Sequence, residues 1–163
     1  MAFTTFSGPL RSGTVRQGTV ASGMNAGTPI LAQTATVSYA AMTTSPTAQA
    51  LFVLPAGAKI VRFDIEVVTA ISGGSVSNVG VTIGNSVTAN KYVTTINTGT
   101  SSAKLAQATI DAAMVVAQTN NIGTSDVTIY GTFTAATGNP TAGSTVVTVE
   151  YLQRAQDGSA NPV

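Results

Sequence analysis

Alternation of apolar and polar residues along the chain predicts β-strands. The clearest run, KIVRFDIEVVT at residues 59–69, has apolar side chains at one set of alternate positions and charged side chains at the other. A period of two is typical of a strand with one buried face and one face turned to water or to a partner. We therefore expect the apolar set in the core and the charged set outside it. The apolar set is Val61, Phe63, Ile65 and Val67, and the charged set is Arg62, Asp64 and Glu66.

Shorter runs of the same kind lie along the rest of the chain, separated by glycine, proline and small polar residues. They are residues 30–42, with Leu31, Ala35, Val37 and Tyr39 on one face, and residues 50–54, 79–83, 91–96, 126–135 and 145–153. We predict that the last two form a hairpin across a polar turn at 137–143. Several short strands with turns between them favour an all-β fold, an antiparallel β-sandwich of jelly-roll-like topology.

Residues 101–118 allow two interpretations. The spacing of Leu105, Ala108, Ala112 and Val115 permits a short helix, whereas residues 113–117 permit a buried strand. Both interpretations stay open.

The first 28 residues show neither pattern. Glycine recurs at every fifth position from Gly8 to Gly23, which disfavours a helix, and apolar alternation is missing. One interpretation is a disordered terminus. We favour an extended interaction arm, because the segment carries apolar side chains and two arginines that a partner can hold. The expected contact residues are Phe3, Phe6, Leu10, Arg11, Val15 and Arg16.

The length of 163 residues fits one domain with extensions. We predict an N-terminal arm at 1–28, a β-sandwich domain at 29–154 and a flexible tail at 155–163.

Charged residues are unusually rare. They make up 8% of the chain, with a formal net charge of +1, whereas an ordinary soluble domain has about 25%. Free monomers usually stay soluble through a mixed, charged surface. The composition therefore indicates a β-rich protein that lives in an assembly or outside a crowded cytosol. The few charges also suggest contacts between copies of the protein.

The chain lacks the residue types that several kinds of functional site require. The chain has no cysteine and no histidine, which excludes a Cys/His zinc site and a Ser-His-Asp triad. No apolar run is long enough for a membrane helix, and no apolar signal core is visible near the N-terminus. The basic residues form no stripe, so nucleic acid is not an expected partner. We expect no metal and no cofactor.

Two short groups of residues contain side chains that occur in catalytic sites. Asp64 and Glu66 stand about 7 Å apart on one strand face, within the spacing of a glycosidase pair. Arg62 beside them favours a solvated or interfacial row of charges, with calcium binding as a lesser alternative. Ser101 and Lys104 could form a Ser-Lys pair, but Ser101 is better suited to capping a helix. We expect no enzymatic activity.

Three phrases resemble small structural proteins of tailed bacteriophages. The first is FVLPAGAKIVRFDIEVVTAISGG at residues 52–74, followed by VGVTIG at 79–84, and the chain closes with a phrase at 141–152. FSGPLRSGT at 6–14 is also similar to the start of phage head proteins. The resemblance covers about residues 50–153.

The resemblance implies a virion structural protein, most often a capsid decoration (cement) protein on the outer capsid surface, which is made in the cytoplasm of a bacterial host. It implies the major capsid protein as partner and favours a homotrimer. The alternative is a head-fibre or receptor-binding module that recognises carbohydrate. Aromatic residues, which commonly stack on sugars, are only 6% of the chain and tryptophan is absent.

Overall fold

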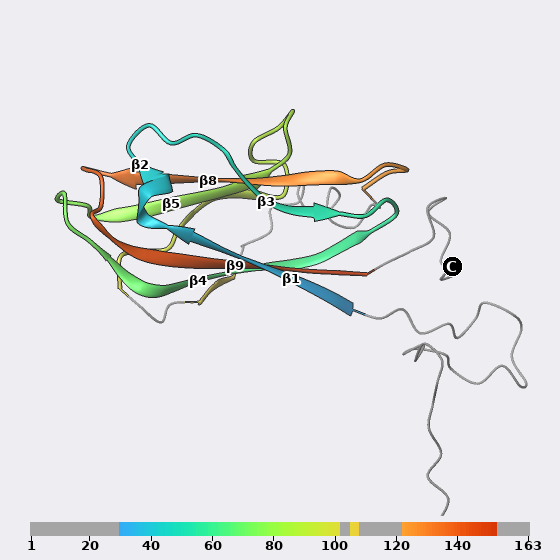
Figure 1. The fold of residues 1–163 in the computed structure, drawn as a ribbon, viewed down its shortest axis with the longest axis horizontal. Helices are drawn as coiled ribbons and strands as arrows, with labels where there is room; N and C mark the ends of the chain where they lie inside the picture. The colour runs from blue at the N-terminus through green and yellow to red at the C-terminus, as the bar shows by residue number, and fades with distance from the viewer. Residues whose placement is uncertain (1–29, 102–104, 108–121, 153–163) are drawn as a thin grey trace, which may run out of the picture.

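The strands of this protein form two sheets that pack face to face (Figure 1). The computed structural model describes residues 30–101, 105–107 and 122–152. The described strands are β1 (Ile30–Ser38), β2 (Met42–Thr43), β3 (Gln49–Leu54), β4 (Lys59–Ser72), β5 (Asn78–Gly84), β6 (Val93–Asn97), β7 (Leu105–Gln107), β8 (Val127–Ala136) and β9 (Ala142–Leu152). A 3-10 helix (Tyr39–Ala41) joins β1 to β2. The predicted all-β sandwich is confirmed.

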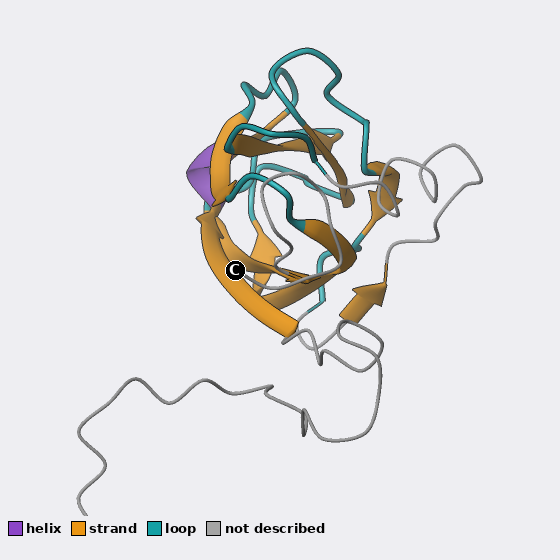
Figure 2. Ribbon diagram, turned by 90° about the vertical axis from the view of Figure 1, so that its right-hand side faces the viewer, coloured by secondary structure: helices purple, strands orange, loops and turns teal. Residues whose placement is uncertain are grey.

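The chain passes from one sheet to the other at six of the eight connections between the described strands. The first sheet has the order β1-β9-β4-β7, and the second has β2-β8-β5-β6 with β3 also paired to β8. All pairs are antiparallel except the short β2–β8 pair. The first described strand pairs with the last, and both sheets bring together strands far apart in sequence. Figure 2 shows the two sheets curving around the space between them.

The predicted hairpin of the last two strands is wrong. β8 pairs with β5, β3 and β2, whereas β9 lies in the other sheet between β1 and β4. The polar segment after Ala136 therefore carries the chain across the sandwich. Both strands alternate because each has one face on the core between the sheets, and alternation alone does not identify the neighbouring strand.

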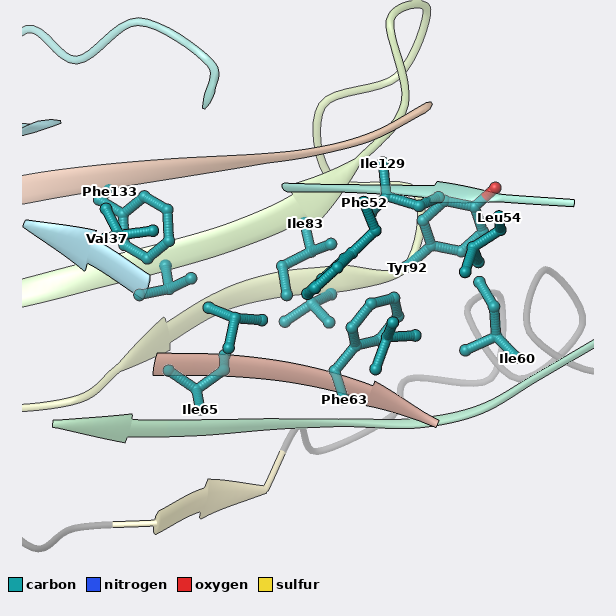
Figure 3. Packing of buried hydrophobic residues seen from close by; sticks show 14 of the residues in the cluster. Val37, Phe52, Leu54, Ile60, Phe63, Ile65, Ile83, Tyr92, Ile129 and Phe133 are labelled. Carbon is teal, nitrogen blue, oxygen red and sulfur yellow. The ribbon is translucent and has the colours of Figure 1, made fainter. Parts of the chain in front are cut away.

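The core lies between the sheets and is built from alternate residues of both (Figure 3). From β4, the side chains of Phe63 and Ile65 point towards Phe52, Ile83 and Tyr92 of the opposite layer. Other fully buried side chains include Met42, Leu54, Ile60, Val67, Val79, Val81, Ile129 and Phe133. Burial of a side chain of this size contributes about 1.5–3 kcal/mol. The alternation predicted for the runs that form β5, β8 and β9 is confirmed, because alternate apolar residues of each strand are buried.

The predicted register of β4 holds from Phe63 onwards and fails before it. Phe63, Ile65 and Val67 are buried, but Val61 is 37% exposed and Ile60 is buried instead. The pairing with β9 shifts between Ile60 and Arg62, which leaves Val61 as an extra residue in a bulge. A β-bulge adds one residue to a strand without a partner on the neighbouring strand. Residues before the bulge therefore face the opposite way from the alternation that holds after it. The expectation that Val61 is a core residue is therefore wrong.

The first predicted strand is shorter than expected. It ends at Ser38, and Tyr39 begins the 3-10 helix with 41% of its surface exposed. Val37 is buried and Ala35 half-buried, whereas Leu31 near the strand's start is 40% exposed. Of this shared face, only Val37 belongs to the buried core, and Ala35 packs against it.

Residues 105–107 form the short strand β7 against β4. This position is extended, so the helical interpretation does not apply to it. Residues 102–104 and 108–118 of the same segment lie outside the described residues.

Candidate interaction surfaces

The predicted contact residues of the arm lie outside the described residues. They are Phe3, Phe6, Leu10, Arg11, Val15 and Arg16. Of the Ser-Lys pair, Ser101 is described and exposed, and Lys104 is not described. The boundaries of the arm and of the tail therefore remain predictions, and the candidate surfaces below belong to the sandwich.

A row of charged side chains crosses the outer face of the first sheet. We call Arg62, Asp64, Glu66 and Glu150 the charge row. Arg62 Nη2 donates to Glu150 Oε1 at 2.8 Å, and Arg62 Nε lies 3.3 Å from Asp64 Oδ2. The hydrogen bond to Glu150, and then the charges of Asp64 and Glu150, raise the pKa of the Arg62 guanidinium. Antiparallel pairing of β4 with β9 creates this row by placing Glu150 opposite Arg62.

The charge row fits an interfacial role better than catalysis. Asp64 and Glu66 share the outer face as predicted, but Arg62 holds Asp64 and supplies the charge pairing expected from the sequence. Asp64 Oδ1 is buried and accepts no hydrogen bond from the described residues. Among the described residues, no group of three acidic, histidine or cysteine side chains could hold a metal ion.

Apolar side chains gather at the end of the first sheet where the described chain begins and ends. We call Ile30, Val61 and Leu152 the apolar end. Ile30 pairs with Leu152 across β1 and β9, and Leu152 pairs with Lys59 across β9 and β4. Ile30 is 60% exposed and Leu152 is half-buried. The sequence did not predict this surface. The pairing of β1, β9 and β4 brings its residues to the same end of the sheet, and the bulge turns Val61 outward.

The loop between β5 and β6 presents a valine to solvent. This Val87 loop, residues 85–91, rises from the second sheet on the side away from the first sheet (Figure 1), and Val87 is 88% exposed. Asn85 Oδ1 accepts hydrogen bonds from the backbone N–H groups of Val87 (3.1 Å) and Thr88 (2.8 Å). The backbone of Asn85 also donates to the carbonyl of Thr88 at 3.0 Å. An apolar side chain on a loop braced in this way is preorganised for contact with another protein.

The base of the Val87 loop depends on a close approach that only glycine permits. A Cβ atom at Gly84 would lie 2.0 Å from the carbonyl oxygen of Thr88 and 2.4 Å from the carbonyl carbon of Ala89. After the loop, Tyr92 donates its backbone N–H to Ile83 at 2.9 Å and buries its ring. In the sequence, Gly84-Asn85-Ser86 signals only the turn and not the exposure of Val87.

No helix within the described ranges has the length and apolar character needed to cross a membrane.

Comparisons with known proteins give a structural likeness only. No protein-family model matches the sequence, and no curated protein matches it significantly. A chain from the capsid of Ralstonia phage GP4 aligns with a TM-score of 0.50 and 16% identity, over 77% of this chain and 85% of that chain. A chain of the cyanophage Pam1 capsid asymmetric unit gives 0.48 and 16% identity, over 86% and 95%.

A chain of the acid-stable capsid of Helicobacter pylori bacteriophage KHP30 gives a TM-score of 0.42 and 19% identity, over 77% of this chain and 92% of that chain. At these identities the likeness is one of fold alone, and it rests on the GP4 chain, whose TM-score is 0.50. The expectation of a β-sandwich similar to phage structural proteins is confirmed at the level of fold.

Proposed function

We propose that this protein is a non-enzymatic structural protein of a bacteriophage virion, and that it decorates the outer surface of the capsid. The fold shared with a chain of the Ralstonia phage GP4 capsid carries the proposal. The alignment spans most of both chains, so the shared unit is the whole sandwich and not a small part of a larger shell protein. The scarcity of charge supports a surface that is largely covered by partners.

The proposed mechanism is mechanical. A decoration protein that bridges neighbouring capsid subunits must be detached before those subunits separate. It stabilises the head because it binds the assembled shell more tightly than free subunits, which shifts the equilibrium towards the shell. The major capsid protein is the expected partner, and the described surface offers the Val87 loop as one contact.

We also propose that the protein is a homotrimer. A sandwich with few charges and an apolar end gives copies a surface to share, and closed symmetry is the usual form of such assemblies. Sedimentation at micromolar concentration tests this state. A monomer that stays soluble at high concentration would contradict it.

Quantitative protein composition of purified virions tests the decoration role. Decoration predicts many copies per particle, in a fixed ratio to the major capsid protein. A few copies per particle would favour the head-fibre or receptor-binding alternative, and absence from the particle would refute both.

A further inference from the structure

The outer edge of β1 lacks the features that usually protect a sheet edge. β1 runs for nine residues, ILAQTATVS, without a charge or a proline. Its pairing with β9 is unbroken from Ile30–Leu152 to Ser38–Ser144. Within the described residues, the backbone of β1 pairs with β9 alone. An edge strand leaves every second N–H and C=O group unpaired, and natural proteins blunt such edges with charges, prolines or bulges.

The other described edges are shorter or interrupted. On the far side of the same sheet, β7 has three residues and pairs only with residues 64–66 of β4, and β4 itself is irregular because its pairing with β9 shifts register three times. In the second sheet, β6 has five residues and its pairing with β5 shifts register. β3 is interrupted by a shift between Ala50 and Phe52, and the Gln33 side chain donates to the carbonyl of Val53 at 3.1 Å. β1 is therefore the one long and regular edge in the described part of the chain.

The charge beside this edge favours a basic partner. Glu150 lies next to β1, opposite Ala32. The charge row contains three carboxylates and one guanidinium, an excess of two negative charges. Residues 1–29 contain Arg11 and Arg16 and no acidic residue. Arginine forms charge-assisted hydrogen bonds to carboxylates, so this segment complements the surface that borders β1.

Length and position favour residues 1–29 of another copy over those of the same chain. The segment is long enough to span up to about 95 Å when extended, and it joins the sandwich at Ile30, the first residue of the edge itself. To pair with its own β1, the chain would have to reverse direction next to Pro29. The segment of a second copy has no such constraint.

We propose that the outer edge of β1 accepts an extended segment of residues 1–29 from a second copy, which adds a strand to the β1-β9-β4-β7 sheet. Backbone hydrogen bonds supply the affinity in this mode of recognition, and side chains that alternate along the added strand supply specificity. The inference goes beyond capsid binding: it concerns copies of this chain in solution, so its failure would leave the proposed function standing.

Disulfide trapping tests the contact on a chain with no native cysteine. Thr34 is exposed on β1, with its Oγ1 3.4 Å from Thr148 Oγ1. Thr34→Cys protein is mixed with tagged protein carrying one cysteine in the arm, at Thr14, Thr19 or Ser22. Side chains opposite each other on neighbouring strands lie about 5 Å apart at Cβ, close enough for a disulfide to form. The control partner is Ser86→Cys on the exposed Val87 loop.

The proposal expects a covalent dimer between Thr34→Cys and one arm position, at several times the yield with Ser86→Cys. Equal yields at all positions would overturn it. A dominant dimer of Thr34→Cys with itself would also overturn it, because β1 would then pair with β1. A double-cysteine chain that closes within one monomer at high dilution would assign the edge to its own arm and refute the second copy.

Hydrogen exchange of the full chain gives an independent test. At concentrations that keep copies together, all amides of β1 should be protected. Dilution to monomer should raise the exchange rate of every second β1 amide about tenfold or more, because those groups then face water. Alternate β1 amides that exchange freely at every concentration would refute an added strand.

Discussion

The ring of Phe63 lies 6.1 Å from the ring of Tyr92, measured between their centroids, and the two planes are inclined by 38°. Phe63 belongs to β4 of the first sheet, and Tyr92 directly precedes β6 of the second. Aromatic pairs at such separations and tilts stabilise a core beyond the area they bury. This pair therefore joins the two sheets beside the base of the Val87 loop.

Replacement of Phe63 should be far more damaging than replacement of its near neighbour Val61. Phe63→Ala should lower the free energy of unfolding by about 3–5 kcal/mol, because it leaves a cavity in a packed core. Val61→Ala should cost less than about 1 kcal/mol, because Val61 stands in an exposed bulge. Urea denaturation measures both. Equal losses would mean that the register of β4 before Phe63 is wrong.

Alkaline pH should destabilise the protein through Tyr92. Burial raises the pKa of the Tyr92 phenol above its ordinary value of 10.0. The unfolded chain therefore loses this proton at lower pH than the folded protein. The contribution to stability is complete below about pH 10 and is lost as pH rises through the folded pKa. Urea midpoints measured from neutral to alkaline pH should fall less steeply for Tyr92→Phe than for the wild type.

The matched control for this pH dependence is Ile83→Val, which changes a buried side chain that carries no titratable group. Ile83→Val should keep the wild-type slope. Identical slopes for the wild type and Tyr92→Phe would show that the buried phenol does not cause the alkaline loss.

The Val87 loop should matter for shell binding and little for folding. Val87→Asp should leave the thermal melting temperature nearly unchanged, because the side chain is 88% exposed. The same change should weaken co-sedimentation with capsids, because a carboxylate in an apolar contact must be desolvated. Gly84→Ala should lower both melting temperature and binding, since the new methyl group would meet the backbone of Thr88. Wild-type binding by Val87→Asp would exclude the loop as a contact.

The arm should be dispensable for folding and required for placement on the shell. Deletion of residues 1–28 should leave the main unfolding transition of the isolated monomer nearly unchanged, because the described core residues begin at Val37. The same deletion should strongly weaken co-sedimentation with capsids. Arg11→Ala with Arg16→Ala should weaken it less, because exposed ion pairs contribute about 1 kcal/mol or less. Tight binding by the truncated chain would mean that the arm is only a disordered terminus with no role in shell binding.

Local patterns in the sequence predicted the strands well, and their partners poorly. Alternation located β4, β5, β8 and β9, because each has one face on the core between the sheets. The same alternation fits a hairpin and a crossing between sheets equally, so β9 was assigned to the wrong neighbour. The alternation in the sequence predicted that Val61 faces inward, but a bulge in the backbone places Ile60 there instead. The sequence did not distinguish the two, because both residues are apolar and either can fill the inward position.

The candidate surfaces were harder to predict than the fold. The charge row was visible in Arg62, Asp64 and Glu66, but Glu150 joins it only through strand pairing across 88 residues of sequence. The edge of β1 has no signature in its residues, because an edge is defined by the strand that is missing beside it. Val87 lies in an ordinary polar turn, and its exposure follows from the hydrogen bonds of Asn85.

Co-sedimentation of the purified full chain with capsids that lack it tests the central claim most directly. The account predicts saturable binding at a fixed, high number of copies per assembled shell, with much weaker binding to free capsid subunits. Absence of binding to the shell, or equal affinity for free subunits, would contradict a decoration protein that stabilises the assembled head.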